Sequence, residues 1–79
     1  MKIEIRLYAS LARFLPEQST GDACIIDLPE GKTVKELLSQ LGVPLESVKL
    51  IFINHIHAGD NRVLKDGDRL GIFPPVAGG

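Results

Sequence analysis

The chain has 79 residues, near the lower limit at which a single hydrophobic core stabilises a fold without metal ions or disulfide bridges. Nine basic and ten acidic residues are scattered along it, which predicts no nucleic-acid partner. Hydrophobic residues make up 44%, yet no run approaches the ~18 apolar residues of a membrane span, so we expect no membrane partner. Residues 1–6 alternate charged and aliphatic side chains instead of forming a signal peptide, which predicts a cytoplasmic protein.

Two strands and a helical turn are predicted in the first third of the chain. Residues 2–8 alternate aliphatic and charged side chains, the period-two pattern of a half-buried strand. Residues 11–15 have apolar side chains at helical spacing and predict a short turn that stops at Pro16. Residues 22–28 alternate again and place Cys24 inward. This single cysteine can form no internal disulfide, and we expect it to be a core thiol.

The clearest predicted element is a helix that begins after Thr33. Thr33 and Glu36 have the Thr-x-x-Glu spacing of a capping box, in which each residue binds the backbone N–H of the other. Gly42 is placed to end the helix in the left-handed conformation, and Pro44 prevents its continuation. The apolar stripe of this helix consists of Val34, Leu37, Leu38 and Leu41.

The last third predicts two more strands. Residues 48–53 are mostly apolar on both faces, so we expect a helix over one side and another covering over the other. Asp66-Gly67 is a strong turn dipeptide, and residues 69–73 read as a final strand that Pro74 ends. One helix and one sheet of four or five strands give an α+β class.

Two short patterns suggest chemistry but lack essential parts. Gly31-Lys32-Thr33 follows a strand and opens a helix, as the end of a phosphate-binding loop does, but its first glycine is missing. His55 and His57 could offer two imidazoles to a metal ion, but a third and fourth ligand are not evident, so we expect no metal site. No acid–base constellation is apparent, and we expect no catalysis by the body of the protein.

The tail, residues 74–79, carries the chemistry. Pro74 and Pro75 fix the backbone and lack N–H groups, so they hold an extended departure from the domain. An extended tail of six residues reaches at most ~20 Å, enough to enter a cleft of a partner. Gly78 and Gly79 have no Cβ, so a partner and a nucleotide can approach the terminal carboxylate closely. A frayed glycine end without function is the alternative reading.

Residues 64–70, Leu-Lys-Asp-Gly-Asp-Arg-Leu, followed by residues 73–79, Phe-Pro-Pro-Val-Ala-Gly-Gly, resemble the C-terminal signature of the MoaD/ThiS sulfur-carrier family. The resemblance covers the whole chain and is greater to the small subunit of molybdopterin synthase than to thiamine-pathway carriers. It implies a ubiquitin-like β-grasp fold, with a mixed sheet of four or five strands and one main helix on one face. It also implies a β-grasp domain at 1–73 and an extended, flexible reactive tail at 74–79.

The resemblance further implies a reaction cycle without a bound cofactor. A ubiquitin-activating-like adenylyltransferase of the MoeB/ThiF type uses ATP to adenylate the carboxylate of Gly79, and a sulfurtransferase or persulfide then replaces AMP to leave a covalent C-terminal thiocarboxylate. Gly78 provides steric access. The tail finally delivers sulfur inside the large subunit of molybdopterin synthase, or inside thiazole synthase if the carrier belongs to the thiamine pathway.

Family members dock their partners with the sheet face that the helix leaves bare, which the resemblance assigns here to the second apolar face of strand 48–53. A small second core under the loop 54–62 is the alternative. One departure is Asn54-His55, where many family members have Asn-Gly, which leaves the tight turn there less certain. The expected partner-binding residues are Ile51, Ile53, Phe73, Pro74, Pro75, Val76 and Ala77.

Three functions remain open at this point. The first is a sulfur carrier that acts as the small subunit of molybdopterin synthase and has no turnover alone. The second keeps the fold but serves thiamine, another thiolated metabolite or tRNA, or modifies lysines. The third is a non-catalytic β-grasp interaction module with an idle tail.

Overall fold

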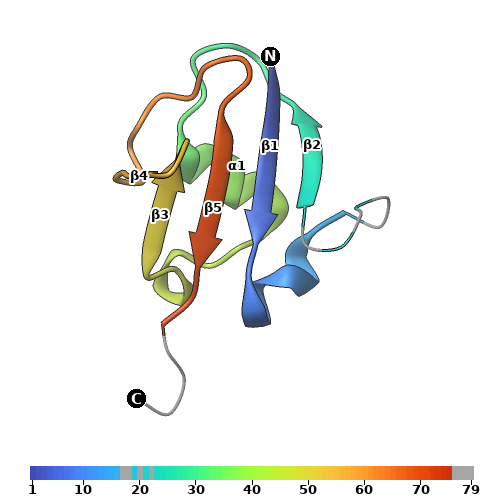
Figure 1. Cartoon of the computed structure of the whole chain (residues 1–79), viewed down its shortest axis with the longest axis vertical. Coiled ribbons are helices and arrows are strands. Elements are labelled where there is room, and N and C mark those ends of the chain that lie inside the picture. The colour runs from blue at the N-terminus through green and yellow to red at the C-terminus, as the bar shows by residue number, and fades with distance from the viewer. Residues whose placement is uncertain (17–18, 20, 22, 76–79) are drawn as a thin grey trace.

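Five strands form one mixed sheet in the computed structural model, which describes residues 1–16, 19, 21 and 23–75 (Figure 1). The strand order is β2-β1-β5-β3-β4. β1 pairs in parallel with β5, and the other neighbours pair antiparallel. The strands are β1 (Lys2–Leu7), β2 (Ala23–Asp27), β3 (Leu50–Ile53), β4 (Ile56–His57) and β5 (Arg69–Phe73).

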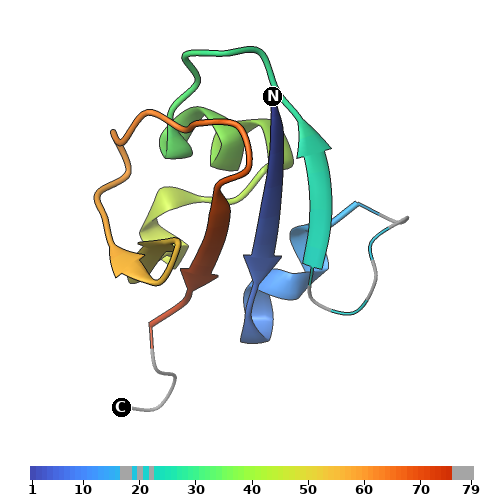
Figure 2. The ribbon, with the colours of Figure 1, turned by 45° about the horizontal axis from the view of Figure 1, so that its top comes forward.

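The helix α1 (Val34–Leu41) crosses behind the sheet and covers one of its faces, as Figures 1 and 2 both show. The predicted capping box is confirmed: the backbone N–H of Glu36 donates to Thr33 Oγ1 at 3.2 Å, and the backbone N–H of Thr33 donates to Glu36 Oε1 at 3.0 Å. Gly42 ends the helix with φ 83°, a left-handed conformation that favours glycine. The sequence-predicted limits of this helix are therefore correct.

Two short 3₁₀ helices flank these elements. η1 (Ala9–Phe14) occupies the predicted helical turn and ends before Pro16, and η2 (Leu45–Ser47) follows Pro44. None of the helices in the described part of the chain has the length and apolar character needed to cross a membrane.

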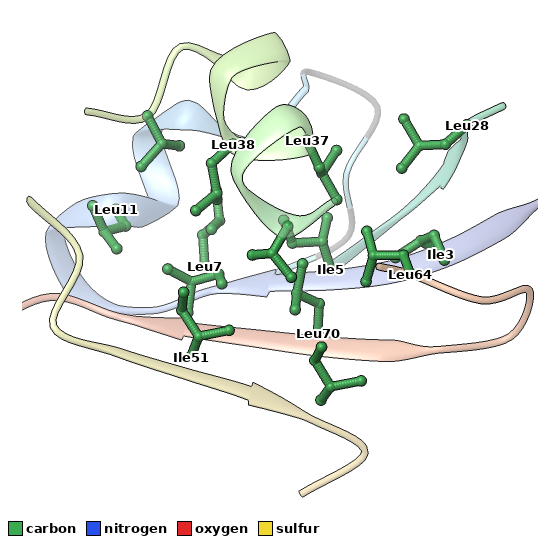
Figure 3. Packing of buried hydrophobic residues seen from close by; sticks show 14 residues of the cluster. Ile3, Ile5, Leu7, Leu11, Leu28, Leu37, Leu38, Ile51, Leu64 and Leu70 are labelled. Atoms are coloured by element: carbon green, nitrogen blue, oxygen red, sulfur yellow. The ribbon is translucent and has the colours of Figure 1, made fainter. Parts of the chain in front are cut away.

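The hydrophobic core lies between α1 and the sheet (Figure 3). Alternate residues of β1, β3 and β5 point toward the helix, because successive side chains of a strand point to opposite faces. Cys24 is half-buried and packs against this cluster, as a core thiol does. The buried residues are Ile3, Ile5, Leu7, Leu11, Leu28, Val34, Leu37, Leu38, Val43, Ile51, Ile53, Leu64, Leu70 and Ile72.

The predicted α+β sheet with one main helix is confirmed, with strand limits within two residues of those expected. β4 is the strand that the sequence did not define. It has two residues and pairs Phe52 with His57 and Ile53 with Ile56 across a two-residue turn. So short a strand leaves almost no alternation in the sequence to find. The proposed division at residue 73 stays a prediction.

Candidate functional site

The sheet face opposite α1, here called the open face, carries the other half of the strand side chains. It includes Glu4 and Arg6 on β1, Phe52 on β3, and Arg69 and Phe73 on β5. No helix lies over it in the described part of the chain (Figure 2). Within the described residues, the open face is therefore the side of the sheet that no helix covers.

Ile51 and Ile53 do not lie on the open face, which corrects the prediction that they form a docking surface there. They are only 6% and 5% exposed and pack under α1, and Figure 3 shows Ile51 among the core residues. The pairing of Ile51 with Ile72 and of Ile53 with Leu70 fixes this orientation, because both partners are core residues of β5. The strand residue that faces outward between them is Phe52.

Phe73 lies on the open face as expected and is held on three sides. Its ring stacks on Tyr8 with 4.4 Å between centroids and 8° between planes, and Phe52 meets it edge-on at 5.7 Å and 87°. Its carbonyl accepts a hydrogen bond from the backbone N–H of Lys49 at 2.8 Å. Aromatic pairs of this geometry add to the stability of burial alone. Phe73 is thus a fixed point at the end of the last strand.

Pro74 and Pro75 follow Phe73 directly and leave the sheet at the end of β5 (Figure 1). Neither has an N–H group with which to extend the ladder, so pairing stops at Phe73. The remaining expected tail residues, Val76, Ala77, Gly78 and Gly79, lie outside the described residues.

A hollow of about 540 Å³ opens on the open face next to Phe73. Its floor is Gly71, which pairs with Arg6 on one side and Phe52 on the other. The further residues that line it are Glu4, Tyr8, His55, Arg69, Leu70 and Phe73. This hollow combines aromatic walls with a charged end, and the sequence alone gave no signal of it, because the pairing of three distant strands creates it.

The charges of the open face are partly paired. Arg6 Nε donates to Glu4 Oε2 at 3.2 Å, and Lys2 Nζ lies 2.9 Å from Asp27 Oδ1 at the β1–β2 edge. The hydrogen bond and charge of Lys2 hold the pKa of the Asp27 carboxyl below its usual value. Both pairs are exposed, so they contribute little to stability and act mainly to set the charge pattern of the face.

The turn between β3 and β4 consists of Asn54 and His55, both with positive φ of 53° and 70°. Two positive φ values in a two-residue hairpin loop are typical of a type I′ turn. The tight turn is therefore present although glycine is missing. Asn54 fixes it: its side-chain Oδ1 accepts from the backbone N–H of Arg69, and its Nδ2 donates to Asp68, both at 3.0 Å.

The two histidines have separate surroundings. His55 lines the hollow, whereas His57 lies on β4 and meets the ring of Phe52 edge-on at 5.7 Å. Within the described ranges, no group of three or more His, Cys, Asp or Glu side chains is placed to hold a metal ion.

The motif at residues 64–70 has a structural explanation in the turn before β5. Asp68 Oδ2 accepts from the backbone N–H of Lys65 at 2.8 Å, and the Asp68 carbonyl accepts from the backbone N–H of Glu4 at 3.0 Å. Asp66 Oδ1 accepts from the backbone N–H of Lys2 at 2.7 Å. These bonds join the turn to β1 and set the parallel β1–β5 register. The motif thereby positions the strand from which the tail departs.

Gly31-Lys32-Thr33 is likewise structural. Lys32 Nζ lies 3.4 Å from Glu36 Oε2, and Thr33 caps α1, so both polar side chains of the pattern already serve the helix.

Comparisons with known proteins identify solved structures that are similar to this one. The chain matches SAMP1 from Haloferax volcanii at a TM-score of 0.73 and 24% identity, with both chains covered in full. It matches a Pyrococcus furiosus protein assigned as subunit 1 of the molybdopterin converting factor at 0.70 and 26%, covering 95% of this chain and 98% of that one. A complex of subunits 1 and 2 of the molybdopterin-converting factor from Helicobacter pylori 26695 matches at 0.62 and 26%, with full coverage of both chains.

These likenesses confirm the expected ubiquitin-like β-grasp fold and the resemblance to subunit 1 of the molybdopterin converting factor. The curated proteins give no match. The family described as Mut7-C ubiquitin matches residues 1–78, which is nearly the whole sequence. The chain therefore belongs to the Mut7-C ubiquitin family.

Proposed function

We propose that the chain is a sulfur carrier that acts as the small subunit of molybdopterin synthase. The Gly79 carboxylate is the reacting group, and Gly78 leaves room for the enzyme and nucleotide around it. One carboxylate oxygen attacks the α-phosphorus of ATP and pyrophosphate leaves; a sulfur nucleophile then attacks the acyl carbon and AMP leaves. The product is a C-terminal thiocarboxylate, and the domain itself turns over no substrate.

The observation that carries this proposal is the way in which contacts fix Phe73, the residue directly before the tail. Phe73 is locked by Tyr8, Phe52 and the ladder bond from Lys49, and Pro74 and Pro75 come directly after it. Phe73 is thus fixed in the sheet, and the two residues that follow it cannot extend the strand pairing, so the described part of the chain leaves the sheet at Pro74 and Pro75. A terminus without function would not require Phe73 to be fixed by these contacts.

The partners follow from the same proposal. The Helicobacter pylori structure is a complex of subunit 1 with subunit 2, and the likeness supports a large-subunit partner for this chain. An adenylyltransferase of the ubiquitin-activating type and a sulfurtransferase would charge the tail. No ATP site on this chain is required, since the activating enzyme binds the nucleotide.

The test is an in vitro charging reaction. The 79-residue chain is incubated with ATP, a MoeB-type adenylyltransferase and sulfide, and its intact mass is measured. Exchange of one oxygen for sulfur adds ~16 Da, and digestion places that mass on the last peptide. A variant with one alanine added after Gly79 serves as the matched control and stays unchanged.

Three results contradict the proposal. If the mass stays unchanged with each of several adenylyltransferases that charge their own carriers, the terminus is not a substrate. If the charged chain appears on lysines of other proteins in cell extract and transfers no sulfur to a molybdopterin precursor, the chain is a protein modifier. Sulfur transfer to a thiazole synthase instead would assign it to the thiamine pathway.

A further inference from the structure

We infer that the hollow on the open face binds a partner segment that places a carboxylate side chain beside an aliphatic one. The aliphatic side chain enters the hollow over Gly71, and the carboxylate lies between His55 and Arg69 at its charged end. This inference builds on the proposed function, since it gives the chemistry by which a partner of the carrier is recognised.

The apolar half of the inference depends on Gly71. Its φ is not among the positive values in the chain, so its backbone does not require glycine. A Cβ at this position would lie 3.6 Å from the Tyr8 ring and 3.8 Å from the Phe73 ring, in ordinary contact. Any side chain here would thus lie against the edges of these two stacked rings and extend into the hollow. Glycine keeps the hollow open, with Phe52 forming its other wall.

The charged half depends on Arg69. Its backbone N–H is bound by Asn54, but in the described part of the chain its exposed guanidinium has no carboxylate within ion-pair distance. Glu4 is its neighbour in the β1–β5 register, yet the Glu4 carboxylate is bound by Arg6. Arg69 and the imidazole of His55 therefore line the hollow with no carboxylate of its described lining left to bind them, since Glu4 is already bound by Arg6. Their N–H donors and the charge of Arg69 favour an acidic partner.

His55 supplies an independent indication. It holds φ 70° at a turn position where glycine is preferred, and its side chain lines the hollow. A residue kept in a strained conformation points to a role for its side chain. The imidazole offers an N–H donor in either protonation state, at the same end of the hollow as Arg69.

The experiment is a titration of the ¹⁵N-labelled 79-residue chain with two acetylated pentapeptides, followed by amide chemical shifts. The probe is Ser-Glu-Leu-Glu-Ser, and its neutral counterpart is Ser-Gln-Leu-Gln-Ser. We expect the acidic peptide to shift the amide signals of Phe52, His55 and Gly71, and to bind at least about threefold more tightly than the neutral peptide.

Three variants sharpen the titration. Arg69→Gln and His55→Gly each weaken binding of the acidic peptide by about twofold to fivefold and leave binding of the neutral peptide unchanged. Gly71→Val weakens the binding of both peptides, because the valine side chain fills the hollow. Arg62→Gln is the matched control: Arg62 is exposed, lies outside the open face and leaves both affinities unchanged. The amide spectrum of each variant reports whether it is folded.

Absence of shifts around the hollow, or equal binding of the two peptides, overturns the inference. Shifts at the same residues that grow with protein concentration in the absence of peptide would assign the hollow to a second copy of the chain, which also overturns it. The titration uses neither ATP nor an activating enzyme. Its failure is therefore distinct from failure of the charging reaction, which tests the carrier function alone.

Discussion

The two faces of the sheet differ in their roles: one forms the hydrophobic core, and the other forms the exposed surface with the hollow. On the face toward α1, side chains from three strands are almost completely buried and form the core. On the open face, the intervening residues of the same strands are exposed or half-buried and form a hollow with paired aromatic rings and charges. Because neighbouring residues belong to opposite faces, a shift of one position changes a residue from scaffold to surface.

This division separates the effects that substitutions have. A change on the covered face lowers the free energy of unfolding through lost packing, whatever partner is present. A change on the open face alters recognition and leaves the fold largely intact. The four predictions below test this division, beginning with the largest expected effect.

Adjacent residues of β3 give the sharpest contrast. Ile51→Ala lowers the free energy of unfolding by about 2–5 kcal/mol, because it leaves a cavity under α1. Leu50→Ala, at a side chain that is 39% exposed, costs less than about 1 kcal/mol. Urea denaturation followed by circular dichroism measures both. Equal losses at the two positions would contradict the assignment of these residues to opposite faces.

The turn before β5 joins β5 to β1, the parallel pair of strands in the middle of the sheet. Asp68→Ala removes its side-chain bonds to Lys65 and Asn54 and lowers the free energy of unfolding by about 1–3 kcal/mol. Asp68→Asn keeps one acceptor and loses less. The same denaturation experiment compares them, with Glu30→Ala, at an exposed carboxylate, as a control for loss of charge. Asp68→Ala with wild-type stability would show that the turn does not depend on these bonds.

Acid should weaken the start of α1. Hydrogen bonds from the backbone and side chain of Thr33 hold the pKa of Glu36 below its usual value, so the charged carboxylate is favoured in the folded state. Its contribution is complete above the unfolded pKa and is lost as pH falls through the lower folded pKa.

We therefore expect Glu36→Gln to be less stable than wild type at about pH 6, and the difference to shrink toward about pH 3. Thr33→Ala provides the cap control and costs about 1 kcal/mol at neutral pH. Denaturation midpoints at both pH values measure the difference. A difference that does not change with pH would mean that the Glu36 charge is not part of the cap.

The smallest effect is expected at the β3–β4 turn. His55→Gly relieves a positive φ of 70° and raises the free energy of unfolding by about 0.5 kcal/mol, since the gain in backbone fit is partly offset by glycine's greater freedom in the unfolded chain. Asn54→Gly at the neighbouring position gains nothing, because it loses the bonds to Asp68 and Arg69. Thermal melting compares the two variants. A destabilised His55→Gly would remove the argument from strain.

Local patterns in the sequence were sufficient for most of the fold. The capping box at Thr33 and the glycine at Gly42 define a helix by short-range hydrogen bonds, which a sequence can display directly. The alternation in residues 2–8 defines β1 in the same way. The position of Phe73 at the end of the last strand also followed from the proline after it.

The side assignment of β3 could not follow from the sequence. Residues 50–53 are apolar at every position, so alternation gives no indication of which pair faces the helix. The register with β5 decides it, by setting Ile51 opposite Ile72 and Phe52 opposite Gly71. The hollow was missed for the same reason, because its floor and walls come from residues that are adjacent only after the strands pair.

The parallel contact of β1 with β5 has a consequence for the order in which the molecule assembles. The contact joins Glu4 to Arg69 and Leu7 to Ile72, so the middle of the sheet closes only when the two most distant strands have met. Contacts between such distant segments slow folding, because the ordering of the intervening chain precedes any gain from pairing. A ribosome-bound chain that stops before Arg69 leaves one side of β1 unpaired and open to association with other chains.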